Sequence, residues 1–305
     1  MSWLKGKTES ATQLSARPPA AVELTPEGVL AAALPGKGAP PVVAFEPLPD
    51  GTLHPGISAP NLAIPDLVAR AVRKALDQVS PRRRAITVIV PDSAVRVFML
   101  DFDSLPAKPA EVIPVLRFRL RKMAPFDVEQ AGISYQILSH NTDETRVLTA
   151  MIPGPVLAEY ETAIRSAGYE PGSVLSASLA ALARVDTDEP VLAACMNAGS
   201  LTTVIAHGQD LLLFRTLELP ENPAQRLAEV QRDIAVASAY FEDKLNQRPQ
   251  TLHYAGRGTA MEFGRWIQER ELNVVDLVPP PATGAATALG PASLAGIAGA
   301  LAGVV

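Results

Sequence analysis

The stretch that decides the fold class is residues 90–106, which read VPDSAVRVFMLDFDSLP. Pro91, Asp92 and Ser93 predict a turn after the apolar run 85–90, because proline fixes φ and the short polar side chains bond to nearby backbone. Residues 95–101 then return to β-branched and aromatic side chains, which favour a strand. The stretch therefore predicts a strand, a tight turn and a second strand.

A basic helix is predicted directly after this stretch. Residues 109–123 carry apolar side chains at helical spacing: Val112, Leu116, Leu120 and Met123. Pro114 is expected to disturb the first turn. The other side carries four cations in six residues: Arg117, Arg119, Arg121 and Lys122. Such a face is either simply solvated or a contact for a partner peptide or an anionic surface.

Strands and helices alternate on both sides of this region. Residues 20–24 and 29–34 predict two strands joined by the turn Thr25-Pro26-Glu27-Gly28, and a helix follows at 66–79. Downstream, the predicted strands are 133–138 and 147–152, and the predicted helices are 155–167 and 176–185. Predicted strands and helices thus lie both before and after the quoted stretch, which is typical of an α/β protein.

A second series of elements begins at Val191. It has three consecutive strands, a long helix and then a helix–strand alternation: 191–196, 201–206, 211–217, 223–245, 251–255, 260–270 and 273–277. The order of strands and helices in this second series resembles that in the first series, although the two amino-acid sequences are not similar. It predicts the α/β fold class with two lobes, split near residues 183–191, and a final helix at 291–305 packed on the protein.

Composition excludes several classes of protein. The net charge of −5 gives no general attraction to nucleic acid, and the lone Cys195 excludes an internal disulfide. The polar start predicts no secretion signal, which favours a cytoplasmic location. The uncharged tail 288–305 is long enough for a membrane anchor, but Pro291 and its many small residues favour a core helix.

No motif in the sequence carries catalysis or a metal site. The four histidines lie far apart, and no Gly-x-Ser-x-Gly motif occurs. Gly36-Lys37-Gly38 lacks the other residues of a phosphate-binding loop. Gly256-Arg257-Gly258, between a predicted strand and a helix, is either a ligand loop or a tight turn. The sequence therefore predicts no catalytic residue and no metal ligand.

Several spaced motifs resemble the PilM family of type IV pilus assembly proteins. They are the Pro-x-Ser turn at Pro91, the Leu-Pro at 105–106, the Ala-Pro-Phe-Asp step at 124–127 and the strand Tyr-Gln-Ile-Leu at 135–138. Weaker similarity extends from Ala20 to Val305. The resemblance implies a two-lobed actin-like fold of the ribonuclease H-like ATPase type, similar also to the cytoplasmic domain of the secretion protein GspL.

The resemblance also implies a domain organisation. A loose N-terminal segment would cover residues 1–19, a first lobe 20–185 and a second lobe 186–305. The first lobe would contain an inserted subdomain at about 92–151. The implied function is a non-catalytic cytoplasmic scaffold, indirectly associated with the inner-membrane pilus platform through the tail of a PilN-like membrane protein. The alternatives are an actin-like ATPase and a type II secretion component.

The nucleotide motifs that the resemblance implies are altered in this chain. The family's two phosphate hairpins read Asp-x-Gly, whereas the matching turns here contain Glu23 and Thr25 in the first and Asn197 and Gly199 in the second. Gly256 and Gly258 match the adenosine-side glycines only with an inserted arginine. The resemblance therefore implies at most weak binding of ATP with Mg²⁺ at these six residues, without hydrolysis.

The partner site implied by the resemblance lies beside the inserted subdomain. On strand 95–101 apolar residues occupy both faces, which suggests that both are covered, one of them by a guest peptide. We predict the contact residues to be Val97, Phe98, Arg117, Phe118 and Arg121. Phe118 is either an aromatic anchor within a cationic rim or a core residue under the Tyr135 strand.

Overall fold

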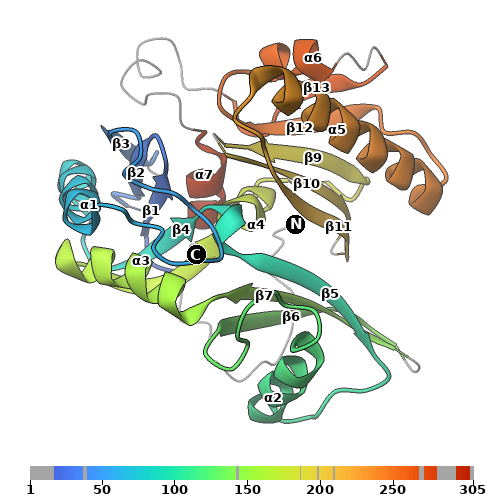
Figure 1. The fold of residues 1–305 in the computed structure, drawn as a ribbon, viewed down its shortest axis with the longest axis horizontal. Coiled ribbons are helices and arrows are strands. Elements are labelled where there is room, and N and C mark those ends of the chain that lie inside the picture. Colours follow the sequence, from blue (N-terminus) through green and yellow to red (C-terminus); the bar gives the residue numbers. More distant parts are fainter. Residues whose placement is uncertain are drawn as a thin grey trace.

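The computed structural model describes residues 17–36, 40–141, 144–185, 187–197, 199–208, 210–267, 271–279 and 293–302. Two five-stranded sheets form the centres of two lobes, and a three-stranded sheet forms a smaller unit beside them (Figure 1). The predicted two-lobed α/β class is thus confirmed, with two separate sheets rather than one continuous sheet.

The first lobe has the strand order β3-β2-β1-β4-β8. Its strands are β1 (Ala20–Thr25), β2 (Gly28–Ala33), β3 (Val42–Pro47), β4 (Ala85–Val90) and β8 (Glu170–Ser176). The first three form an antiparallel meander, while β4 and β8 run parallel to β1. Nearly all residues of β1 and β2 are buried, as expected for strands covered on both faces.

Two helices cover one face of this first sheet, α1 (Pro65–Val79) and α3 (Gly154–Ser166). The predicted amphipathic pattern of α1 is confirmed, because Val68, Val72 and Leu76 are fully buried in the same core. Ser80 ends this helix in the left-handed conformation, with its N–H bonded to the Leu76 carbonyl.

The opposite face of the first sheet carries α4 (Ala177–Leu182) and α7 (Ala295–Ala302). Ile297, Ala300 and Leu301 of α7 pack against the β1–β2 hairpin and Ile89. The helix predicted for residues 291–305 is therefore packed on the protein over its described part, and positions 291–292 and 303–305 lie outside the described residues. However, α7 lies on the first sheet, although residues 186–305 were predicted to form the second lobe.

The second lobe repeats the topology of the first, in the order β11-β10-β9-β12-β13. Its elements are β9 (Val191–Met196), β10 (Ser200–His207), β11 (Asp210–Glu218), α5 (Pro223–Leu245), β12 (Thr251–Gly256), α6 (Ala260–Ile267) and β13 (Asn273–Asp276). A meander is again followed by two parallel strands, and α5 and α6 pack on the sheet. The architectural repeat seen in the sequence is thus present in the structure.

The quoted stretch leads into the inserted subdomain. After β4 come a 3₁₀ turn η1 (Asp92–Ala94), β5 (Arg96–Phe102), α2 (Pro109–Leu120), β6 (Gly132–His140) and β7 (Thr145–Ile152). The strands pair in the order β5-β7-β6, at the bottom of Figure 1 with α2 outermost. Helix α2 begins at Pro109 and includes Pro114, but it ends three residues before the predicted Met123.

Both faces of β5 are covered, but by parts of the same chain. Phe98, Leu100 and Phe102 pack on the side of α2, whereas Met99 packs with residues of β9, β10 and β11 in the second lobe. The apolar pattern of β5 is therefore explained without a guest peptide. Sequence periodicity shows that a face is apolar, but it does not show which element covers it.

Within the described residues, no helix combines the length and the apolar character that crossing a membrane requires. Gly299, which in the sequence could belong to a membrane anchor, instead lies against α4. A Cβ atom at Gly299 would stand 1.8 Å from the carbonyl oxygen of Ala180. The glycine thus allows two helices to approach closely inside a folded lobe.

Candidate functional site

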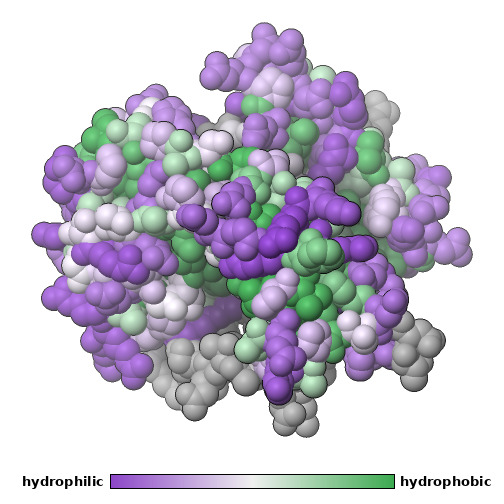
Figure 2. Space-filling model, turned by 60° about the horizontal axis from the view of Figure 1, so that its bottom comes forward, coloured by the Kyte–Doolittle hydropathy of each residue, from purple (hydrophilic) through white to green (hydrophobic). Residues whose placement is uncertain are grey.

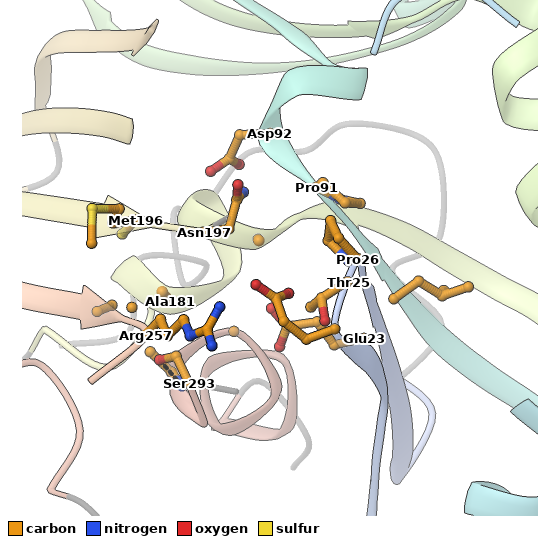
Figure 3. Close-up of a pocket in the computed structure, with 18 residues that line it drawn as sticks. Glu23, Thr25, Pro26, Pro91, Asp92, Ala181, Met196, Asn197, Arg257 and Ser293 are labelled. Atoms are coloured by element: carbon orange, nitrogen blue, oxygen red, sulfur yellow. Dashed lines mark hydrogen bonds between the residues drawn. The ribbon is translucent and has the colours of Figure 1, made fainter. Parts of the chain in front are cut away.

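A small cavity lies where the two lobes meet, beside the start of α7. Its walls come from the β1–β2 turn, the end of β4, α4, the β9–β10 turn, the end of β12 and the start of α7. Figure 3 shows the labelled side chains gathered around this space from both lobes. Four of the six residues predicted for nucleotide line it: Glu23, Thr25, Asn197 and Gly256. Gly199 and Gly258 do not belong to its lining.

The first hairpin is closed by its own side chain. The Thr25 hydroxyl donates to the Gly28 carbonyl at 3.0 Å and lies 3.2 Å from the Gly28 N–H, which donates to it. Pro26 has no N–H to offer. This turn therefore presents few backbone donors to an anion, and the donor of Gly28 is already used.

The second hairpin is closed in the same way by Asn197. Its side-chain oxygen accepts from the backbone N–H of Gly199 at 3.0 Å and of Ser200 at 2.9 Å, and from the Ser200 hydroxyl at 3.1 Å. In a phosphate-binding hairpin such N–H groups would face the ligand. In this protein the side-chain oxygen of Asn197 accepts the hydrogen bonds that a phosphate would otherwise accept.

The glycine loop after β12 is held by tight packing. A Cβ atom at Gly256 would stand 2.5 Å from the Tyr254 hydroxyl oxygen and 2.6 Å from the Met196 carbonyl oxygen. The Tyr254 hydroxyl donates to the Arg257 carbonyl at 2.7 Å. Gly258 has a φ of +83°, which favours glycine. A tight strand-to-helix turn thus explains both glycines.

Carboxylates occupy the start of α6, where a phosphate could otherwise bind. The Thr259 N–H donates to the Glu262 carboxylate at 2.8 Å, and the Ala260 N–H donates to the Asp276 carboxylate at 2.9 Å. These carboxylates satisfy the free N–H groups of the helix terminus. A phosphate would have to displace negative charge to reach them.

Glu23 lies fully inside the protein, under the first turn of α7. The backbone N–H of Ile297 donates to its carboxylate, while the Oε2 atom is buried without a hydrogen-bond partner. Burial, with the nearby charge of Asp92, raises the pKa of Glu23 to about 8. At neutral pH this carboxyl is therefore mostly protonated and cannot supply the charge that Mg²⁺ requires.

Asp92 joins the two lobes, which the turn motif around it did not predict. Its carboxylate accepts from the Ser178 backbone N–H at 3.0 Å and from the hydroxyls of Ser176 and Ser178. It also accepts from the Thr202 hydroxyl of β10 at 2.9 Å, across the lobe boundary. The sequence signal for this role was an acidic residue directly after a buried strand. An aspartate in an exposed turn gives the same signal, so the sequence could not distinguish the two.

Burial also makes the cysteine of this site unreactive. Desolvation, followed by the charge of Asp92, raises the pKa of Cys195 to about 12. Thiolate is the reactive form, so this thiol is inert at neutral pH. Cys195 lies in β9 and lines the cavity.

The cavity does not fit ATP with Mg²⁺. Its volume is about 60 Å³, whereas ligand pockets usually hold roughly 300 Å³ or more. The hairpin donors are used internally, and no group of three or more possible metal ligands occurs among the described residues. At the altered motifs, the protein's own side chains thus occupy the space and the hydrogen-bond donors that a nucleotide would need.

We predict that ATP with Mg²⁺ gives no saturable heat in calorimetry up to about 1 mM, corresponding to less than roughly 4 kcal/mol of binding free energy. Purified protein should also release no phosphate above background. A submicromolar affinity, or phosphate release that Glu23→Ala abolishes, would show that the lobes open to admit nucleotide.

The five residues predicted for partner binding do not form one surface. Val97 is half-buried against both lobes, and Phe98 is half-buried against α2. Arg117 donates to the carbonyls of Val128, Glu129 and Ala131, so it holds the loop before β6. Replacing Arg117 should therefore destabilise the subdomain.

Phe118 and Arg121 lie on the outer side of α2. Phe118 is 70% exposed, so the alternative that it is a core residue is wrong. Arg121 forms an ion pair with Glu129 at 2.7 Å. These two residues face away from the sheet, on the opposite side from the groove described next.

A second cavity, of about 210 Å³, lies between the inserted subdomain and the first lobe. Leu148 and Ala150 of β7 face Leu175 and Leu179 of the β8–α4 segment across it, and Ser134 and Gln136 of β6 line one side. We call this the β6–α4 groove. Sequence reasoning missed it because its residues belong to elements far apart in the chain.

Arg17 reaches into the β6–α4 groove. Its Nη1 atom is buried without a hydrogen-bond partner, and burial lowers the pKa of this guanidinium. A buried cationic donor without a partner is unfavourable. The groove therefore combines apolar walls with one unsatisfied cationic donor.

No protein-family model matches the chain, and no curated protein matches it in sequence. Among solved structures, a chain of a PilM–PilN type IV pilus biogenesis complex matches with a TM-score of 0.73 at 19% identity, over 94% of this chain and 98% of that chain. A Bacteroides thetaiotaomicron protein with an actin-like ATPase fold and unknown function matches with a TM-score of 0.50 at 14% identity, over 88% and 94%.

The cytoplasmic domain of EpsL, an inner-membrane component of the type II secretion system of Vibrio cholerae, matches with a TM-score of 0.49 at 12% identity, over 78% of this chain and 81% of that domain. At such identities the matches describe the fold. The resemblance predicted from the sequence is confirmed at that level: this chain has the two-lobed actin-like fold, in an arrangement shared over nearly its whole length with a chain of the PilM–PilN complex.

Proposed function

We propose that this protein is a non-catalytic scaffold of a type IV pilus assembly platform, at the cytoplasmic face of the inner membrane. It would hold the cytoplasmic tail of a PilN-like membrane protein. The observation that carries the proposal is the β6–α4 groove, which has apolar walls and an unpartnered cationic donor, Arg17. The extensive match to a chain of a PilM–PilN complex supports it.

The shape and chemistry of the groove suit an extended peptide. β6 is an outer strand of its sheet, with β7 as its one strand neighbour among the described residues. An extended tail could add to that edge and place alternate side chains between Leu148 and Leu179. A carboxylate or carbonyl oxygen of the tail would satisfy Arg17.

A scaffold role also agrees with the interlobe site. Its hairpin donors are saturated, Glu23 is held protonated, and the cavity is too small for a nucleotide. The Asp92 network ties the lobes together through buried hydrogen bonds. An actin-like ATPase instead needs an open cleft with a metal-binding carboxylate. We therefore propose that the fold is used here for holding a partner rather than for turnover.

The proposal predicts that Ser134→Trp, which fills the groove from its exposed side, lowers affinity for a PilN-like tail by roughly thirtyfold or more. The measurement is fluorescence anisotropy with a labelled synthetic peptide of the tail. Arg17→Ala should weaken binding by roughly tenfold, because the tail then loses a charged hydrogen-bond donor.

Ser139→Trp is the matched control, since Ser139 is exposed on the same strand but does not line the groove. This control should bind the tail normally, and all three variants should keep the melting temperature within a few degrees. Unchanged tail affinity in Ser134→Trp would mean that the tail docks elsewhere.

A further inference from the structure

The C-terminal end of α2 and the turn after it carry an apolar and cationic surface that the proposed scaffold function does not use. We call Phe118, Arg119, Lys122 and Met123 the α2 tip. Phe118 is 70% exposed and Met123 is 46% exposed, which is unusual for large apolar side chains. In Figure 2, hydrophobic side chains come to the surface among hydrophilic ones on the side that holds the inserted subdomain in Figure 1.

The apolar side chains of the α2 tip do not belong to the core of the subdomain. Leu116 and Leu120 are fully buried under α2. Phe118 stands two residues from each of them, and thus about 200° around the helix from both. Arg119 follows Phe118 directly in the last turn of α2, and Lys122 precedes Met123 directly in the turn after the helix, so each apolar residue has a cationic neighbour in the chain.

The charges at the α2 tip are uncompensated. From Arg117 to Glu129 the chain has four cations and two carboxylates, Asp127 and Glu129. Glu129 pairs with Arg121, and Arg117 is bound to neutral carbonyls. In the described part of the protein, Arg119 and Lys122 form no ion pair. The tip is therefore a local basic spot on a chain whose net charge is −5.

We propose that the α2 tip binds directly to an anionic phospholipid surface, with Phe118 and Met123 inserted between headgroups and Arg119 and Lys122 on their phosphates. Large apolar side chains flanked by cations are the usual chemistry of interfacial membrane contact. Helix α2 lies at the edge of the molecule (Figure 1), and Phe118 and Met123 are exposed there. Two exposed apolar side chains beside cations match the acyl chains and phosphates that a bilayer surface presents.

The α2 tip and the β6–α4 groove lie on opposite sides of the three-stranded sheet. Contact through the tip is thus compatible with a peptide in the groove, and neither surface has to change for the other. Direct lipid contact would add to the indirect membrane association predicted from the sequence. Two weak attachments acting together bind more tightly than either one alone.

The test is co-flotation of the full chain with vesicles, without any partner peptide. We expect binding to vesicles containing 30% phosphatidylglycerol and none to pure phosphatidylcholine (a test composition chosen at roughly the surface charge of anionic membranes). Arg119→Glu with Lys122→Glu should lower the partition coefficient at least about tenfold, as should raising the salt to about 0.5 M. Phe118→Ser should also lower it several-fold, because the inserted apolar surface is lost.

Met261→Ser is the matched control, since Met261 is 68% exposed on α6 of the second lobe, and it should float like the unmodified protein. The proposal is overturned if phosphatidylglycerol vesicles do not retain the protein, or if Met261→Ser loses as much binding as Phe118→Ser. It is also overturned if Phe118→Ser floats like the unmodified protein but no longer binds the PilN-like tail peptide in the anisotropy assay. In that case the α2 tip is a protein-docking surface.

Discussion

Gly299→Val should lower the melting temperature of this protein by roughly 5–10 °C, corresponding to about 3 kcal/mol of overpacking. A Cβ atom at this position would overlap the backbone of α4, at 1.8 Å from the Ala180 carbonyl oxygen and 2.6 Å from its carbonyl carbon. Backbone in a packed helix cannot rotate away as a side chain can, so α7 itself has to move. Differential scanning fluorimetry measures the effect directly.

The displaced helix should also be detectable locally. Amide hydrogen exchange at Ile297 and Leu301 should accelerate in Gly299→Val, because these residues pack on the first sheet only while α7 is docked. Ala302→Val adds a larger side chain at an exposed position of the same helix, and it should shift the melting temperature by no more than about 1–2 °C. Equal shifts in the two variants would disprove the close contact between α7 and α4.

Glu23→Gln should stabilise the protein at pH 8 by roughly 4 kcal/mol and should have little effect near pH 4. Burial raises the pKa of Glu23 to about 8 from an ordinary value of 4.5. Between these two pH values the unfolded chain releases a proton that the folded chain keeps. The stability contribution of this residue is therefore fully present below about pH 4.5, falls as the pH rises to about 8, and stays low above it.

Glutamine is neutral at every pH and still offers an oxygen to the Ile297 N–H, so the variant should lose this pH dependence. The measurement is chemical denaturation of both proteins at several pH values from 4 to 8.5, with the difference between them plotted against pH. Asp103→Asn, at an exposed position, is the control for removing one carboxylate. A constant difference between Glu23→Gln and the unmodified protein would show that Glu23 is ionised in the folded state.

Local sequence patterns predicted the arrangement of the lobes well. Residues 90–106 gave the strand, turn and strand that lead into the inserted subdomain, and α1 buries the predicted apolar stripe. The repeated order of elements predicted two sheets of like topology. These features depend on turn residues and on side-chain periods of about two or 3.6 residues, which are properties of short segments.

Prediction from the sequence was less successful where one type of residue could play either of two structural roles. Arg117 and Phe118 are neighbours in a basic helix, yet one binds backbone carbonyls and the other faces outward. Glu23, Thr25, Asn197 and Gly256 do converge on one cavity, as the resemblance implied. The side chains of Glu23, Thr25 and Asn197, however, bond to the protein's own backbone, and no sequence motif specifies these hydrogen bonds.

The sequence by itself determined most of the strands and helices, which of their faces are apolar, and that the chain resembles an actin-like scaffold with altered nucleotide motifs. It did not predict β3 and β8, the two outer strands of the first sheet. The tertiary structure decided which elements cover those faces. It placed α7 on the first sheet, joined the lobes through Asp92 and Thr202, and formed the β6–α4 groove from segments far apart in the chain. The physical reason is that hydrophobic burial is non-directional: an apolar face must be covered, but only the packing of the whole chain selects its cover.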